Sequence, residues 1–143
     1  MSYTDTIEVN KPLKEVFAAV SNAENGPHFF DNVEKVEKIT DGPIQIGTKY
    51  KETKQIRSYK AEAILEVADY VTNKQYKVKS EPNGLIVWNE YTFTPTEQGT
   101  KIEFKMKIQT KGIRNLLTRP IIVNILKKEN ETHLSNIKKF LEA

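Results

Sequence analysis

The 143-residue sequence contains no cysteine, which excludes disulfide bonds, thiolate metal sites and a cysteine nucleophile. It has only two histidines, His28 and His133, and they lack the i, i+4 spacing of a zinc-binding helical pair. No glycine-rich phosphate loop is present either. We therefore predict neither a metal site nor a bound cofactor.

Long apolar runs are also missing. No stretch approaches the roughly 18 apolar residues that a transmembrane helix needs. The first residues show neither the basic nor the apolar part of a signal peptide. We expect a cytoplasmic protein without stable membrane insertion. The composition, 38% hydrophobic and 29% charged, and the length favour one globular domain over residues 1–143.

Basic and acidic residues nearly balance along the chain, except near the C-terminus, where basic residues are in excess. The net charge is +3, and residues 111–143 carry seven basic and three acidic side chains. One interpretation is a patch for anionic ligands or a membrane surface, and the more ordinary one is a solvated helix face. Basic residues are not interleaved with aromatic ones, so we predict no nucleic-acid partner.

What the sequence does contain is a change of periodicity. Most of the chain up to residue 110 alternates apolar and polar residues, which predicts antiparallel strands. In residues 100–110, for example, Ile102, Phe104, Met106 and Ile108 share one face. The predicted strands cover residues 3–9, 33–40, 48–57, 59–70, 75–81, 85–94 and 100–110.

Helical patterns occupy two places. After the first strand, Pro12 suits the first turn of a helix that Asn10 or Lys11 would cap, and residues 23–30 predict a second short helix or turn. From residue 114 to residue 142, apolar residues recur every three or four positions, which predicts one long amphipathic helix. The expected α+β fold is a strongly curved antiparallel sheet of about seven strands around this C-terminal helix, with two short helices after the first strand.

Three stretches carry a resemblance to a known superfamily. They are Ile7 to Asn22 (IEVNKPLKEVFAAVSN), Asp41 to Thr48 (DGPIQIGT) and Tyr91 to Ile102 (YTFTPTEQGTKI). With the order of predicted elements, they resemble the START-like, helix-grip (SRPBCC) superfamily, and most closely its small bacterial polyketide cyclase/dehydrase and lipid-transport group. One departure is Phe29-Phe30, which stands where many members have a tryptophan.

The resemblance implies a hydrophobic cavity between the long helix and the sheet, where members hold lipids, hormones or polyketides. Polar residues predicted to face inward are the most informative, because a buried polar group needs a partner. Glu129 and His133 are four residues apart on the helix, so they could pair and make a general base or a ligand anchor. Asn89 and Tyr91 share a strand face and could orient a ligand. The first pair could instead be exposed on the flank of the helix, or His133 could be a satisfied histidine at the cavity rim. The second pair could satisfy each other or a buried water.

We therefore select candidate residues for two roles. The catalytic candidates are His133, Glu129 and Tyr91. The candidate ligand-binding residues are Phe30, Tyr76, Asn89, Tyr91, Phe104, Met106, Leu126, Glu129, His133 and Ile137.

Three functional hypotheses remain open. The first is a carrier or sensor of a small hydrophobic molecule, present as a monomer or weak dimer. The alternative is a cyclase or dehydratase that uses the same cavity, and the third is a protein-interaction domain. Because no constellation specifies a reaction, binding ranks above catalysis.

Overall fold

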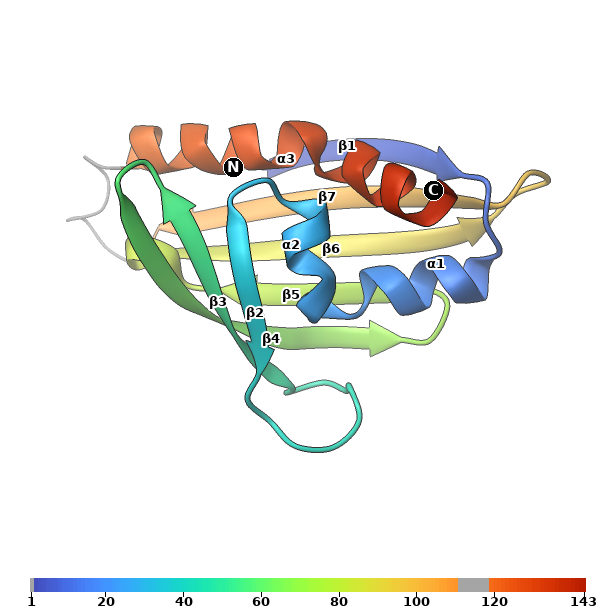
Figure 1. Cartoon of the computed structure of the whole chain (residues 1–143), viewed down its shortest axis with the longest axis horizontal. Coiled ribbons are helices and arrows are strands. Elements are labelled where there is room, and N and C mark those ends of the chain that lie inside the picture. The colour runs from blue at the N-terminus through green and yellow to red at the C-terminus, as the bar shows by residue number, and fades with distance from the viewer. Residues whose placement is uncertain (1, 111–118) are drawn as a thin grey trace.

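A computed structural model describes residues 2–110 and 119–143, apart from the side chains of Asn83, Arg119, 121–123 and Ile125. Its strands are β1 (Ser2–Val9), β2 (Val33–Lys38), β3 (Lys49–Ile56), β4 (Tyr59–Val71), β5 (Gln75–Ser80), β6 (Leu85–Pro95) and β7 (Thr100–Thr110). They form one antiparallel sheet in the order β1-β7-β6-β5-β4-β3-β2. The sheet curves, so β2 and β3 turn across one of its ends (Figure 1).

The alternation of apolar and polar residues explains these strands. On β7, Ile102, Phe104, Met106 and Ile108 are buried, whereas Glu103, Lys105 and Lys107 are exposed. Register irregularities interrupt the pairing of β2 with β3 between Val33 and Lys35, and of β4 with β5 between Val67 and Asp69. Such bulges bend the strands that carry them, which helps the sheet to curve.

The helices lie on one side of this sheet (Figure 1). They are α1 (Leu13–Val20), the 3-10 turn η1 (Ala23–Asn25), α2 (Gly26–Phe29) and α3 (Arg119–Glu142). A further 3-10 turn, η2 (Pro82–Gly84), precedes β6. Helix α3 packs against β1 and α2. None of the helices in the described ranges is long and apolar enough to cross a membrane.

Most expected elements are confirmed within two residues, and the predicted curved sheet with its C-terminal helix is correct. The predicted N-cap of the first helix, Asn10 or Lys11, is wrong. Pro12 itself is the N-cap of α1, and no side chain caps it. Residues 114–118 of the expected long helix lie outside the described residues.

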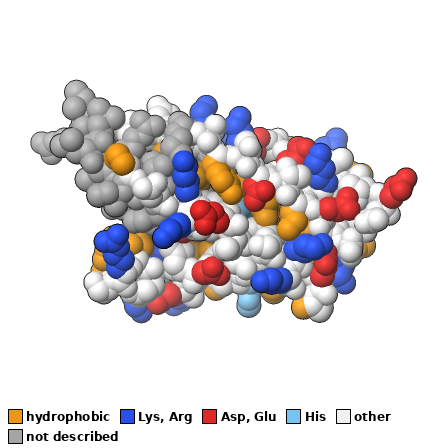
Figure 2. All heavy atoms as spheres, turned by 90° about the horizontal axis from the view of Figure 1, so that it is seen from above, with side chains coloured by type: hydrophobic (Ala, Val, Ile, Leu, Met, Phe, Trp, Pro, Cys, Tyr) orange, Lys and Arg blue, Asp and Glu red, His pale blue; other side chains and the backbone are white. Residues whose placement is uncertain are grey.

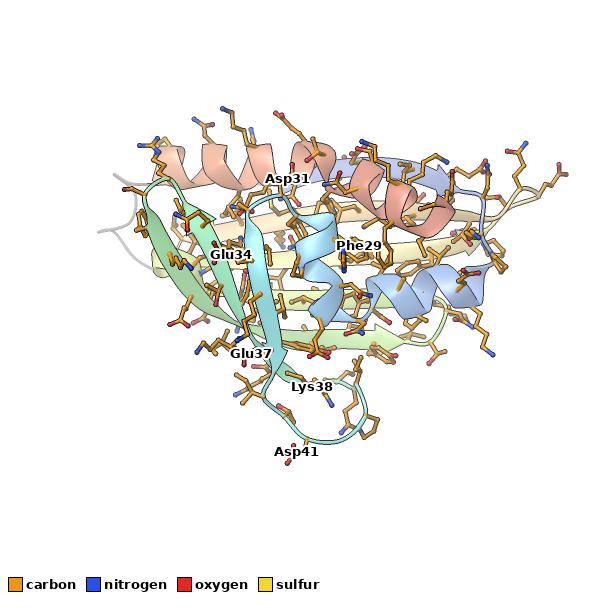
Figure 3. All side chains as sticks on the ribbon, in the orientation of Figure 1. Phe29, Asp31, Glu34, Glu37, Lys38 and Asp41 are labelled. Carbon is orange, nitrogen blue, oxygen red and sulfur yellow. The ribbon has the colours of Figure 1, made fainter. Side chains whose placement is uncertain are left out.

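Two groups of contacts hold the helices in place. Phe17 of α1 meets Tyr70 and Phe93 edge to face, with ring centroids 5.4 and 5.2 Å apart. In the connection from α2 to β2, Asp31 accepts hydrogen bonds from Thr132 and Asn136 of α3 (Figure 3). The α2 segment is therefore fixed to the C-terminal helix.

Candidate functional site

A cavity of about 670 Å³ opens between the helices and the concave face of β3 to β7. Its apolar lining comes from α1, the α2 region, the sheet and α3. These residues are Val20, Ala23, Phe29, Phe30, Ile56, Ala61, Ala63, Leu65, Val78, Met106 and Leu126. Such a volume suits one small organic molecule, because ligand pockets commonly measure about 300–1,000 Å³.

The strands at this end of the sheet leave space because their inward residues are small or charged. The inward row of β4 begins with Ala61 and Ala63, and the larger Leu65 and Val67 follow only toward α1. On β3, Tyr50 is fully buried, and the inward positions after it are Glu52 and Lys54. A charged pair and two alanines cannot fill the volume that leucine or phenylalanine would occupy.

Polar groups in the cavity lining form two separate clusters. In the first, the Lys54 Nζ lies 2.9 and 3.0 Å from the two carboxylate oxygens of Glu129 and 3.6 Å from Glu52 Oε1. Asn32 donates a hydrogen bond of 2.6 Å to Glu129. These contacts join β3 to α3 across the cavity.

The second cluster is a chain of hydrogen bonds from Tyr91 into the core. The hydroxyl oxygen of Tyr91 lies 3.3 Å from His133 Nε2, and His133 Nδ1 lies 3.3 Å from the Asn130 carbonyl oxygen. A carbonyl only accepts, so the proton of a neutral imidazole lies on Nδ1 and the Tyr91 hydroxyl donates to Nε2. Phe30 stacks on the imidazole with ring centroids 4.9 Å apart.

Burial shifts the proton affinities of this chain. It lowers the pKa of His133 to about 4, against the smaller opposing effect of the hydrogen bond to Asn130. It also raises the pKa of Tyr91, and the nearby Glu52 charge adds to that effect. Transfer of a proton from Tyr91 to His133 is therefore unfavourable in the resting protein.

Several polar atoms next to the cavity have no partner among the described residues. They are the Tyr76 hydroxyl and the side-chain carbonyl oxygens of Asn89 and Asn130. Asn130 donates its amide hydrogens to the Leu126 carbonyl oxygen at 2.7 Å and to the Met106 sulfur at 3.1 Å, which leaves the carbonyl oxygen free. Buried groups of this kind are usually satisfied, so they indicate positions where a ligand or water would bind.

The structure places seven of the ten candidate ligand-binding residues in the lining: Phe30, Tyr76, Asn89, Tyr91, Met106, Leu126 and Glu129. Phe104, His133 and Ile137 are instead buried in the core outside this lining. The expected pairing of Glu129 with His133 is wrong, because Glu129 binds Lys54 and Asn32 while His133 contacts Tyr91. Both residues lie on the helix face that was predicted to point inward, but each has a partner on a strand far away in the sequence.

Sequence reasoning missed several polar residues of the lining, and Glu52, Lys54 and Asn130 are the buried or partly buried ones that form its polar clusters. A signal for the first two exists in the segment Lys49–Ile56. Tyr50 is its large apolar residue, and period-two alternation from Tyr50 leads to Glu52 and Lys54 on the same face.

No group of three or more His, Asp or Glu in the described ranges is arranged to hold a metal ion.

Comparisons with known proteins identify the family and the fold of the chain. The model of the family described as "Polyketide cyclase / dehydrase and lipid transport" matches residues 1–142. No curated protein matches the chain. Among solved structures, Ara h 8.0201 is 15% identical with a TM-score of 0.77, covering 99% of this chain and 97% of that one.

Two further solved structures have the same fold. The protein TTHA0849 from Thermus thermophilus is 13% identical with a TM-score of 0.77 and covers 99% and 97% of the two chains. The di-domain ARO/CYC StfQ from the steffimycin biosynthetic pathway is 15% identical with a TM-score of 0.79. The similarity to StfQ covers 99% of this chain but 50% of that one. At these identities the similarity shows the fold alone.

Proposed function

The chain belongs to the polyketide cyclase/dehydrase and lipid transport family, and from that premise we propose that it binds a small hydrophobic molecule in the cavity under α3. One observation carries the proposal. The concave face of a well-packed sheet is left hollow over about 670 Å³ and is lined mainly by apolar side chains. Residues 1–143 would act as one ligand-binding domain.

The roles within the cavity follow from the lining. Phe30, Met106 and Leu126 would contact the apolar body of the ligand, together with the alanines of β4. Tyr76, Asn89 and Tyr91 would contact its polar groups, since two of them carry unpaired polar atoms. Phe104 and Ile137 would support this lining from behind.

Catalysis by a cyclase or dehydratase is the second candidate, because Tyr91 in the lining contacts the buried His133. In that case Tyr91 would donate or accept the proton and His133 would position it. The proton affinities argue against a strong base here, since the pKa of His133 is lowered and that of Tyr91 is raised. Binding without chemistry therefore ranks first. Enzymatic activity, cytoplasmic location and a monomeric or weakly dimeric state stay predictions.

Filling the cavity tests the proposal. N-phenyl-1-naphthylamine, a neutral apolar dye that fluoresces in apolar surroundings, should bind the protein saturably. Ala63→Leu places a larger side chain in the cavity and should weaken binding at least about tenfold, because it occupies the ligand's volume. The matched control is Ala68→Leu, at an exposed position of the same strand.

Dye binding that is absent, or that survives Ala63→Leu unchanged, would contradict the proposal. Circular dichroism of both variants shows whether the fold is retained. Native mass spectrometry of the protein purified from its own host would then show whether an apolar passenger fills the cavity. Tyr91→Phe tests the enzymatic alternative, since it should leave dye binding intact while removing any turnover.

A further inference from the structure

The cavity lining includes Arg57 and Glu62, which are exposed and opposite in charge, but its less exposed charged side chains do not balance one another. Two carboxylates, those of Glu52 and Glu129, share a single ammonium group, that of Lys54. All three residues lie in the cavity lining, and Glu52 is only 8% exposed. An isolated charge in such a position is costly, so the excess carboxylate needs an explanation.

Lys54 interacts with both carboxylates but lies closer to Glu129 than to Glu52. Its ammonium group lies within 3.0 Å of both Glu129 oxygens, whereas its distance to Glu52 is 3.6 Å. Glu129 also accepts the short hydrogen bond from Asn32. Among the residues described, Lys54 is the one cation within 4.0 Å of Glu52. The two carboxylates therefore share one cation, and Glu52 has the longer contact with it.

Burial also disfavours the charged form of Glu52. Loss of water raises the pKa of Glu52, and the Glu129 charge raises it further, while Lys54 opposes both effects incompletely. A second positive charge next to this carboxyl group would stabilise its ionised form and balance the two carboxylates. The lining contains one other cation, Arg57, but it is exposed and no ion pair joins it to Glu52 among the described residues, which leaves the ligand as the source of that charge.

The other polar atoms of the lining that lack a partner offer evidence independent of charge, because several of them are hydrogen-bond acceptors. Asn130, which is 2% exposed, has an unpaired carbonyl oxygen whose orientation is fixed by the amide hydrogen bond to Leu126. Asn89 has a second unpaired carbonyl oxygen. Tyr91 donates its proton to His133, so its oxygen accepts from the cavity side. A ligand that satisfies these atoms must be a hydrogen-bond donor.

Resting on the proposed function, we propose that the cavity selects apolar molecules that carry one protonated amino group, which Glu52 binds. An ammonium group supplies the missing positive charge and offers three N–H donors to the surrounding acceptors. The apolar remainder of the ligand would lie against Phe30, Ala63 and Leu126. An anionic ligand of the same size would instead meet the Glu52 charge and be rejected.

Two matched series of ligands test this selectivity. The first is 1-naphthylmethylamine, 1-naphthalenemethanol and 1-naphthoic acid, and the second is octylamine, octanol and octanoic acid. Isothermal titration calorimetry at neutral pH should rank the amine first and the acid last in the series that fits the cavity. The amine should bind at least about tenfold more tightly than the acid, because the Glu52 carboxylate attracts the ammonium group and repels the ionised acid.

The variant Glu52→Gln keeps the side-chain shape and removes the charge. It should weaken amine binding about tenfold and leave alcohol binding nearly unchanged. The matched control is Glu37→Gln, at an exposed carboxylate of β2 that forms an ion pair with Lys35 and does not line the cavity (Glu37 is labelled in Figure 3). This control should keep the wild-type ranking.

An alcohol or acid that binds as tightly as the amine would overturn this inference alone and leave the proposed function standing. The same holds if Glu52→Gln spares amine binding. Failure of all six compounds to bind would overturn both. The ranking in the wild-type protein decides the question even if Glu52→Gln does not fold.

Discussion

The two ends of the concave face are made of similar strands but have different interiors. Near α1, which we call the packed end, the rings of Phe17, Tyr70 and Phe93 interlock edge to face, and Val9 and Val16 are fully buried. At the cavity end, the inward positions hold alanines and a charged cluster. Strand alternation decides which side faces inward, whereas the size and charge of those residues decide whether the interior is filled.

The outer surface gives no comparable contrast. On the face shown in Figure 2, basic and acidic side chains are interspersed rather than gathered by sign. On the outer face of the sheet, Lys51 pairs with Glu62 and Lys77 with Glu90 across neighbouring strands. On the face shown in Figure 2, charge therefore does not single out a second site.

Truncation of a ring should have the largest effect at the packed end. Phe17→Ala removes a side chain that is 3% exposed and should lower the free energy of unfolding by about 4 kcal/mol. Phe30→Ala, which removes a partly buried ring at the cavity, should cost about 2 kcal/mol or less. Urea unfolding measures both. Equal losses would mean that the two ends are packed alike.

Loss of the Lys54 ammonium group from the cavity should have the next largest effect on stability. Lys54→Met leaves Glu52 and Glu129 close together without a counter-charge, and should cost about 3 kcal/mol. The control Lys51→Met breaks an exposed pair with Glu62 and should not change stability measurably. Thermal unfolding compares the two. If Lys54→Met were as stable as the wild type, the carboxyl groups would already be protonated.

The buried imidazole should make stability depend on pH. In the unfolded chain the pKa of His133 returns to 6.5, so below this pH the unfolded state binds a proton that the folded state excludes until about pH 4. Stability is therefore present above pH 6.5 and falls on acidification, by about 2 kcal/mol at about pH 5. The raised pKa of Glu52 acts in the opposite direction, because its folded carboxyl group binds a proton first.

A variant isolates the histidine contribution. His133→Gln should lose less stability than the wild type between pH 7 and 5, as measured by urea unfolding at each pH. His28→Gln changes an exposed histidine and should keep the wild-type dependence. Identical dependence in all three proteins would show that His133 binds a proton in the folded state as readily as in the unfolded state.

The smallest effect should come from the unpaired hydroxyl of Tyr76. Tyr76→Phe breaks no hydrogen bond to a described residue and removes a buried polar atom, so stability should stay unchanged or rise by up to about 1 kcal/mol. Tyr91→Phe loses its contact with His133 and should cost about 1 kcal/mol. Differential scanning calorimetry resolves this difference. A loss in Tyr76→Phe would indicate a buried partner for its hydroxyl.

The sequence predicts the fold almost completely because each strand shows its own alternation and each turn its own residues. The site is harder to predict, because its contacts join residues far apart in the chain. Glu129 meets Lys54, 75 residues earlier, and helical spacing alone suggested His133 instead. Alternation also does not show depth along a strand, so Phe104 was grouped with Met106 although only Met106 lines the cavity.

A crystal structure grown with N-phenyl-1-naphthylamine tests the central claim most directly, because it shows whether the cavity exists and accepts a ligand. We predict electron density for the dye between α3 and the inward alanines of β4, in contact with Phe30 and Leu126. A structure in which protein side chains fill this space, or in which the dye binds elsewhere, would contradict the account.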